Sequence, residues 1–393
     1  MMAILNFSGA EYASRLGRVR SRMAEAGLDV LVITEPANIY YLSGYDAWSF
    51  YTVQALVIFQ DVELPLWVGR LIDSATAHFT SYLPSDRIVP YPDAYVQAAD
   101  RHASQFIADT ILRELPSAKT VGVEMGAYYY TARDHAEFVK AMPNVRFKDA
   151  ELLVNWVRFI KSAEEVAYMR QAGVITERMI TRAVEVAAPG VRECDVAAAI
   201  YHAQMTGTDS FGGIPATSPP HMGFGARARE AHPIFSDRPI AANSVANIEI
   251  SGCRLRYHAP MSRTIYFGKP PQSYRDLASH VIDGIDASLD VVRPGATCEE
   301  IESAWRKSLT IHGIEKDSRL GYSIGVAYTP TWGERTASIR RGDHTVLEAG
   351  VAFHLMAGLW LEDTGITITQ SFVVTEDGYE PLTKSPRELI VKD

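Results

Sequence analysis

The side chains able to do nucleophilic or acid–base chemistry are spread along the chain and form no local metal-binding motif. The three cysteines, Cys194, Cys253 and Cys298, are widely spaced and include no CxxC pair. They therefore predict neither a disulfide framework nor a structural zinc site. His258 and His354 each stand alone among apolar residues, and such a histidine is more often a satisfied core residue than a ligand or a base. Whether these side chains form a site depends on the elements that carry them.

Composition and charge limit the classes of partner. The chain has 393 residues, 47% of them apolar and 22% charged, which is typical of a folded protein of two or three domains. Its 38 Lys and Arg against 47 Asp and Glu include no basic block, which argues against nucleic acid as a partner. The N-terminus lacks the pattern of a signal peptide. The apolar segment 350–361 is too short to span a bilayer, so we expect a cytoplasmic protein with no membrane partner.

The first part of the chain alternates between helix-like and strand-like segments. Helices follow from apolar residues at a helical period, and strands from short apolar runs bounded by turn residues. The predicted elements are helices over 12–27 and 102–115 and strands over 28–33, 55–59, 64–68 and 121–124. Strands that alternate with helices predict an α/β domain with a mixed sheet. We place this domain at residues 1–155.

The second part, residues 156–393, begins with a long helix and contains an internal echo. Ser162 and Glu165 form a capping box that starts the helix, and the Pro-Gly pair at 189–190 stops it. A second Pro-Gly pair at 294–295 again follows a long helix and precedes a shorter one. Two such units predict a duplicated α+β domain with a cleft between its halves. The alternative is a chance similarity of two helix stops.

Several ordered segments resemble the creatinase/prolidase/methionine aminopeptidase family, whose catalytic domain has the pita-bread fold. The matching segments are FIKSAEEVAYMR at 159–170, HPIFSDRPI at 232–240, SRTIYFG at 262–268 and VVTEDG at 373–378. The resemblance covers essentially the whole chain. It implies a creatinase-type N-terminal domain followed by a pita-bread catalytic domain, with His232 at the position of the family's active-site histidine.

The positions that hold metal in metal-dependent members of this family carry other residues here. The family uses two Asp, one His and two Glu for a dinuclear centre. The corresponding residues are Glu249, Pro260, Tyr322, Met356, and Thr369 or Gln370. Only Glu249 among them is a hard-metal ligand, and one ligand does not make a site. The resemblance therefore implies an enzyme with no metal and no other cofactor, or a pita-bread protein that has lost catalysis and serves as a binding module.

The chemistry of a metal-free site restricts the substrate. A metal pair polarises a neutral amide and ionises water, whereas an amidinium or guanidinium carbon is already activated. Metal ions repel such a cation, and a buried carboxylate such as Glu249 attracts it. We therefore expect hydrolysis of a C–N bond at a cationic carbon, as in creatinase, the metal-free relative.

Further segments resemble the ectoine hydrolases of this family. They are YYLSGYDAWSFY at 40–51, IEISGCRLRYHAPMSRT at 248–264, GYSIG at 321–325, WGER at 332–335 and FHLMAGLW at 353–360. The resemblance implies opening of ectoine, a cyclic amidinium carboxylate, to N-acetyl-2,4-diaminobutyrate in compatible-solute degradation. Segment 223–232 is richer in Arg than we expect for that group. A different cyclic amidine or guanidine as substrate, with creatinase-like chemistry, is thus the alternative.

The resemblance also assigns roles to individual residues. Glu249 is expected to attack the amidinium carbon or to act as a base on water, and His232 to give a proton to the leaving nitrogen. The expected substrate-binding residues are Tyr322, His258, His354, Trp332, Trp360, Asp46 and Trp48. Trp360 is assigned a cation–π contact, and Asp46 and Trp48 are assigned to the closure of the partner's pocket in a homodimer. A deacetylase is expected to act on the product.

Overall fold

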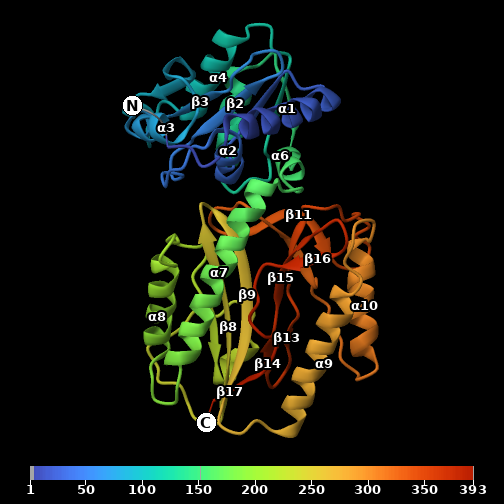
Figure 1. Ribbon diagram of the computed structural model, residues 1–393. Coiled ribbons are helices and arrows are strands. Elements are labelled where there is room, and N and C mark those ends of the chain that lie inside the picture. The colour runs from blue at the N-terminus through green and yellow to red at the C-terminus, as the bar shows by residue number, and fades with distance from the viewer. Residues whose placement is uncertain (1–3, 151, 393) are drawn as a thin grey trace. The chain divides into compact units, whose positions relative to one another are not determined.

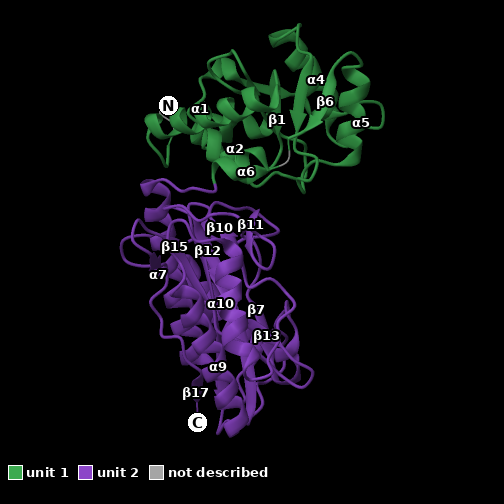
Figure 2. Cartoon of the chain, turned by 90° about the vertical axis from the view of Figure 1, so that its right-hand side faces the viewer, with its two compact units in different colours: residues 1–158 green, residues 159–393 purple. Residues whose placement is uncertain are grey.

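The computed structural model describes residues 4–150 and 152–392, and the chain divides into two compact units, Met1–Arg158 and Phe159–Asp393 (Figure 2). The expected boundary after residue 155 falls inside helix α6 (Leu153–Val157), three residues before the observed division. The short helix belongs as a whole to the first unit, so the chain passes between the units only after it ends. No described helix combines the length and apolar character needed to cross a membrane.

The N-terminal unit contains the expected mixed sheet. Its strand order is β4-β3-β2-β1-β5-β6. The β1–β2 and β2–β3 pairs are antiparallel, whereas the pairs β3–β4, β1–β5 and β5–β6 are parallel. The strands are β1 (Val30–Ile33), β2 (Ala55–Phe59), β3 (Leu66–Arg70), β4 (Ile88–Tyr91), β5 (Thr120–Val123) and β6 (Arg146–Asp149). The central strands are completely buried, which explains why they read as continuous apolar runs.

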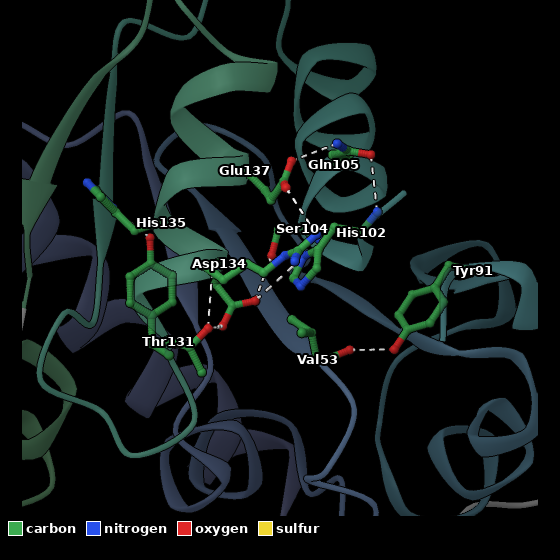
Figure 3. A network of polar contacts seen from close by, with 11 residues as sticks. Val53, Tyr91, His102, Ser104, Gln105, Thr131, Asp134, His135 and Glu137 are labelled. Carbon is green, nitrogen blue, oxygen red and sulfur yellow. Dashed lines mark hydrogen bonds and ion pairs between the residues drawn. The ribbon is translucent and has the colours of Figure 1, made fainter. Parts of the chain in front are cut away.

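Two helices of this unit begin at one shared carboxylate (Figure 3). Thr131 caps α5, and its backbone N–H and hydroxyl donate to Asp134 at 2.7 and 2.6 Å. The hydroxyl of Ser104, in the first turn of α4, donates to the same carboxylate at 2.9 Å. Negative charge at a helix N-terminus is favourable, so Asp134 stabilises both helix starts. The other helices are α1 (Gly9–Ala26), α2 (Pro36–Ser43) and α3 (Ser74–Thr80), with α4 at Ala103–Glu114 and α5 at Ala132–Ala141.

The second unit opens with the predicted capping box. Ser162 accepts from the N–H of Glu165, whose carboxylate accepts in return from the N–H of Ser162. Helix α7 (Ala163–Val186) then packs with α8 (Glu193–Thr206) on strands β8 and β9. Helices α9 (Gln272–Leu289) and α10 (Cys298–Thr310) pack on each other and on the sheet that contains strand β11 (Gly333–Ile339). Figure 1 shows them on the orange side of this unit.

The internal echo is a structural repeat. Gly190 and Gly295 both have a φ of 88°, a conformation that favours glycine. Their N–H groups donate to equivalent carbonyls, of Ile240 and Leu347 respectively, each at 2.9 Å. Isolated β-bridges at Arg192–Pro239 and Thr297–Val346 also correspond. Chance similarity of two helix stops would not reproduce these tertiary contacts. Each half also has its own buried apolar cluster.

The strands of this unit form two larger sheets and a short hairpin. The first sheet has the order β17-β9-β8-β7, the second has the order β11-β10-β12-β15-β16, and β13 pairs with β14. The strands are β7 (His221–Phe224), β8 (Ser244–Arg254), β9 (Tyr257–Phe267), β10 (Gly321–Ile324), β11 (Gly333–Ile339), β12 (Ala352–Leu355), β13 (Gly358–Trp360), β14 (Gly365–Thr367), β15 (Gln370–Val374), β16 (Tyr379–Pro381) and β17 (Ile390–Lys392). The resemblance to a pita-bread domain is confirmed by this order of helices and strands together with the comparisons below.

The two larger sheets meet along β9 and the segment between β14 and β15. The N–H of Ser262 donates to Thr369 Oγ1 at 2.7 Å, and the N–H of Thr369 donates to Ser262 O at 3.2 Å. Buried Arg263 donates to carbonyls on four residues, at Ser262, Thr369, Ser385 and Pro386. These bonds fix β8 and β9 against β10 and β12, which carry the candidate site.

Candidate active site

A cavity of about 290 Å³ brings together polar residues from both halves of the second unit. Strands β7, β8 and β10 line it, together with the loop after the short helix η4 (Gly225–Arg229) and the segment between β10 and β11. Its lining residues are Ser218, His221, His232, Glu249, Arg319, Tyr322, Pro330, Thr331 and Trp332. Four residues expected at the site, Glu249, His232, Tyr322 and Trp332, therefore lie around one cavity.

Glu249 is the buried carboxyl group of this cavity. It lies in the middle of β8, paired with His221 of β7 on one side and Ser262 of β9 on the other, and it is 7% exposed. Burial raises the pKa of this carboxyl to about 8, because a low-dielectric surrounding disfavours the ionised form. In the empty cavity at neutral pH the carboxyl is therefore mostly protonated, and a bound cation would ionise it.

Two histidines stand beside this carboxyl. The rings of His221 and His232 have centroids 5.3 Å apart and are nearly perpendicular, and the Trp332 ring is 5.9 Å from that of His221. Burial, with a smaller effect of His232, lowers the pKa of His221 to about 4, so its imidazole is neutral. The N–H of Met222 donates to Pro233 O at 2.9 Å, and this bond holds the exposed His232 loop against β7.

A chain of hydrogen bonds runs from the cavity to the sheet junction. Trp332 Nε1 donates to Tyr322 OH at 2.7 Å, and Tyr322 OH lies 3.0 Å from His354 Nδ1. His354 Nε2 in turn lies 2.8 Å from Thr369 Oγ1, which also accepts from the N–H of Ser262. Burial lowers the pKa of His354 to about 3 and raises that of Tyr322, with the charge of Glu249 adding to the latter.

The direction of this chain follows from which hydroxyl protons need an acceptor. Thr369 Oγ1 already accepts a hydrogen bond from the N–H of Ser262. Among the described contacts of this hydroxyl, the acceptor for its own proton is His354 Nε2, so the Thr369 hydroxyl donates to that nitrogen. The other ring nitrogen of neutral His354 then carries the proton and donates to Tyr322 OH. Since Tyr322 OH thus accepts from two donors, its own proton is directed into the cavity, where Glu249 lies.

His354 does not line the cavity itself; it hydrogen-bonds to Tyr322, which does. His258 lies further along β9, paired with Cys253, and neither of its ring nitrogens has a hydrogen-bond partner in the described part of the chain. The Nζ of Lys316 lies 4.9 Å from the centroid of the Trp360 ring. The cation that contacts the face of this ring is therefore a lysine side chain of the protein itself. Among the described residues, the cavity lining includes neither side chain. The structure does not bring His258 and Trp360 to this cavity, and their contact with substrate stays a prediction.

Asp46 and Trp48 lie in the N-terminal unit, in the segment after α2. The N–H of Asp46 donates to Thr80 Oγ1 at 3.1 Å, and Trp48 is 62% exposed with its ring edge against Phe50. Tyr51 of the same segment is 71% exposed, and it is apolar patches, more than single rings, that mark interfaces. The role of Asp46 and Trp48 in closing a partner's pocket stays a prediction.

Two charged or titratable residues of the cavity, His221 and Arg319, did not follow from the sequence. His221 lies on a strand of four residues, and irregular chain separates this strand from β8. No hydrophobic period therefore indicates that it pairs with Glu249. Arg319 precedes β10, and its guanidinium covers the Tyr322 ring at 4.5 Å. Arg319 lies two residues before the expected site segment 321–325. This closeness in sequence is the signal that indicates Arg319 as a candidate site residue.

The donor set does not fit a dinuclear metal centre. The five positions that hold metal in metal-dependent relatives carry only one carboxylate here, that of Glu249. The fifth position, for which the sequence left Thr369 or Gln370, corresponds to Thr369, because Gln370 donates to Thr383 at 3.0 Å instead. Over residues 4–150 and 152–392, no three His, Cys, Asp or Glu side chains are grouped so as to hold a metal ion. Proline and methionine side chains do not replace bridging carboxylates.

Comparisons with known proteins agree with this architecture. Residues 167–376 match metallopeptidase family M24, and residues 15–160 match the creatinase/prolidase N-terminal domain. The chain is 75% identical to the uncharacterized hydrolase/peptidase y4tM of Sinorhizobium fredii over 100% of both chains. It is 41% identical to the ectoine hydrolase of Halomonas elongata over 99% of both. The solved dipeptidase PepE of Mycobacterium ulcerans superposes with a TM-score of 0.79 at 26% identity, covering 98% of this chain and 99% of PepE.

The matches to the two family models together cover most of the chain, and the relatives match it from end to end. The fold of both units is the one expected from the sequence resemblance. The chain therefore belongs to metallopeptidase family M24, as a hydrolase with a creatinase/prolidase N-terminal domain.

Proposed function

We propose that this chain hydrolyses the cyclic amidine ring of ectoine, without a metal, to N-acetyl-L-2,4-diaminobutyrate. The observation that carries the proposal is the presence of Glu249 and Arg319 in one cavity whose donors do not fit a metal centre. Ectoine bears an amidinium and a carboxylate, so its two charges are complementary to these two side chains. The 41% identity to an ectoine hydrolase over 99% of both chains supports the same substrate.

The protonation of Glu249 links binding to chemistry. With a pKa of about 8, the empty cavity holds a neutral carboxyl and avoids the cost of an unpaired buried charge. A cationic ring brought next to it favours the ionised form and displaces the proton. The nucleophile is thereby generated only when the substrate is present, and the Tyr322 hydroxyl donates a hydrogen bond to the resulting carboxylate.

The ring opens in two steps. A Glu249 oxygen forms a bond to the amidinium carbon, and the C=N electron pair moves to nitrogen. One ring C–N bond then breaks, its electron pair leaves with that nitrogen, and His232 supplies the proton. Water adds to the same carbon and gives one proton back to His232. The bond to Glu249 then breaks with its electron pair on the Glu249 oxygen, and an N-acetylated diamine remains. In the alternative route Glu249 removes a proton from water, and that water attacks the carbon directly.

The Arg-rich segment that suggested a different substrate lies away from the cavity. Arg227 forms an ion pair with Glu230 at 3.1 Å, both being partly exposed, and Arg229 is exposed. Neither arginine belongs to the described cavity lining. This placement supports ectoine over another cyclic amidine or guanidine, and the experiment below includes the guanidine creatine as the alternative substrate.

The assembly completes the proposal. We assign Asp46 and Trp48 to the closure of the neighbouring subunit's cavity in a homodimer, as the exposure of Trp48 and its contact with Phe50 suggest. The product keeps one acetyl group on nitrogen, so a deacetylase is the class of enzyme that consumes it. We propose no nucleic acid and no membrane as partners.

The test compares three substrates with purified protein. Ectoine, creatine and an Xaa-Pro dipeptide are each incubated with and without a chelator, and products are identified by NMR. We expect turnover of ectoine alone, unchanged by chelator. Turnover of the dipeptide, or loss of ectoine turnover on chelation, contradicts the proposal, and turnover of creatine alone replaces ectoine by a guanidine.

A variant pair tests the role of Glu249 in the same assay. Glu249→Gln keeps the shape of the side chain but removes the nucleophile, and we expect turnover to fall by about 10³-fold or more. Glu230→Gln, at an exposed glutamate outside the cavity lining, is the matched control and is expected to keep turnover. Near-normal turnover of Glu249→Gln would make Glu249 a structural residue.

A further inference from the structure

His221 has the features of a substrate-contacting group that the reaction above does not use. It lines the cavity, and the β7–β8 ladder holds it directly opposite Glu249. Its ring nitrogen Nδ1 is buried and has no hydrogen-bond partner among the described residues. His354 differs, because both of its nitrogens are engaged by protein groups. A buried polar group without a protein partner is uncommon in a folded protein.

The charge state of His221 defines what it offers to a ligand. Burial and the neighbouring His232 keep its imidazole neutral at pH 7, so it presents one N–H donor and one nitrogen acceptor. A neutral imidazole of this kind is a poor acid but a good acceptor for the N–H of a cation. His232 is exposed, in the loop held against β7, and remains available to exchange protons with solvent.

We infer that His221 accepts a hydrogen bond from one amidine nitrogen of the substrate while His232 protonates the other, so that the two imidazoles select which ring C–N bond breaks. This inference rests on the proposed function. After a Glu249 oxygen has bonded to the amidinium carbon, either nitrogen is able to leave with its electron pair. The nitrogen that receives the His232 proton leaves as an amine, and the nitrogen held by His221 keeps its bond to the acyl carbon.

The cavity makes the two nitrogens different. A cyclic amidinium carboxylate has one nitrogen on the carbon that bears the carboxylate and one nitrogen further away. Arg319, an exposed residue of the cavity lining whose guanidinium lies over the Tyr322 ring, would bind that carboxylate and fix the orientation of the ring. With the orientation fixed, the places of His221 and His232 decide which of two N-acyl isomers is formed.

The experiment measures the ratio of these isomers by NMR, with ectoine as the substrate. We expect the wild type to form mainly one isomer, and His221→Ala to reduce the isomer ratio by about 10-fold with a raised KM. His221→Gln offers an amide oxygen as acceptor and is expected to restore part of the selectivity. His202→Gln, at an exposed histidine of α8, is the control and should keep the wild-type ratio.

The outcomes separate the two proposals. If the wild type opens the ring and His221→Ala leaves the isomer ratio and KM unchanged, the inference about His221 is wrong and the proposed function stands. An equal mixture of isomers from the wild type also overturns the inference alone. If the wild type opens no cyclic amidine, the proposed function fails and this inference with it. Should the alanine variant not fold, His221→Phe takes its place, since it keeps a ring but offers no acceptor. An unchanged isomer ratio and KM for His221→Phe would contradict the role.

Discussion

Replacing Glu249 by glutamine measures what the burial of this carboxyl costs the fold. Burial raises its pKa from 4.5 to about 8, whereas the unfolded chain keeps the lower value. Between these pH values the native state holds one more proton than the unfolded state, so the stability of the wild type falls as the pH rises through this window. The step from 4.5 to about 8 corresponds to about 5 kcal/mol at most, since water entering the cavity reduces it.

Glutamine binds no proton, so its contribution is the same at every pH. Denaturant unfolding of both proteins from about pH 5 to about pH 9 should show similar free energies of unfolding at the acid end. The variant should become more stable than the wild type by up to about 5 kcal/mol at the alkaline end. Other titrating groups contribute to both proteins and cancel in the difference. Glu230→Gln, at an exposed glutamate outside the cavity lining, is the control for the substitution of glutamate by glutamine.

A difference between wild type and Glu249→Gln that stays constant from about pH 5 to about pH 9 would refute the reasoning. It would mean that Glu249 is already ionised in the empty cavity, and the cation would then not be needed to generate the nucleophile. The same result would remove the reason for proton release on binding.

Three further predictions concern the same site and the assembly. Calorimetry in buffers of different ionisation enthalpy should detect release of close to one proton when ectoine binds at pH 7, falling toward none above about pH 9; no release at pH 7 would contradict a protonated Glu249. Tyr322→Phe leaves the donors Trp332 Nε1 and His354 without their acceptor, and we expect a loss of about 1–3 kcal/mol in the free energy of unfolding together with slower turnover, whereas unchanged stability would show that the chain of hydrogen bonds is not needed. Trp48→Ser should convert the expected homodimer to monomer at micromolar concentration in light scattering, and a wild type that is already monomeric would rule out the dimer.

Much of the fold follows from local patterns in the sequence. The capping box at Ser162 and Glu165 forms as expected, because both partners lie within one helical turn. The two Pro-Gly pairs mark the repeat because each half must stop a helix in the same way. The domain boundary was three residues too early, because nothing in the apolar pattern separates a short final helix from the linker.

The candidate site was less predictable because it depends on contacts between distant segments. Glu249 and Tyr322 were placed through the family resemblance, and the cavity contains both. His221 is missed because its register with β8 is set by tertiary structure and by no local period. Trp360 was assigned to a substrate cation, yet Lys316 occupies its face. A sequence pattern indicates that an aromatic ring will meet a cation, but not which cation it will be.

The pairing of β17 with β9 has a consequence for how the second unit is made. Residues Ile390–Lys392 form a parallel ladder with Ile265–Phe267, and Arg263 of β9 donates to the carbonyls of Ser385 and Pro386. A ribosome adds roughly 5–20 residues per second, so the intervening segment takes on the order of ten seconds to synthesise. During that time one edge of β9 has no strand partner and is open to pairing with another chain.

The N-terminal unit has no such delay. All six strands of its sheet lie between residues 30 and 149, so this sheet is complete before β9 leaves the ribosome. Newly made chains are therefore expected to carry a folded first unit joined to an unfinished second one. Chaperone demand and co-translational aggregation should accordingly depend on how fast the last strand follows β9, and rare codons placed between them would lengthen the exposed period.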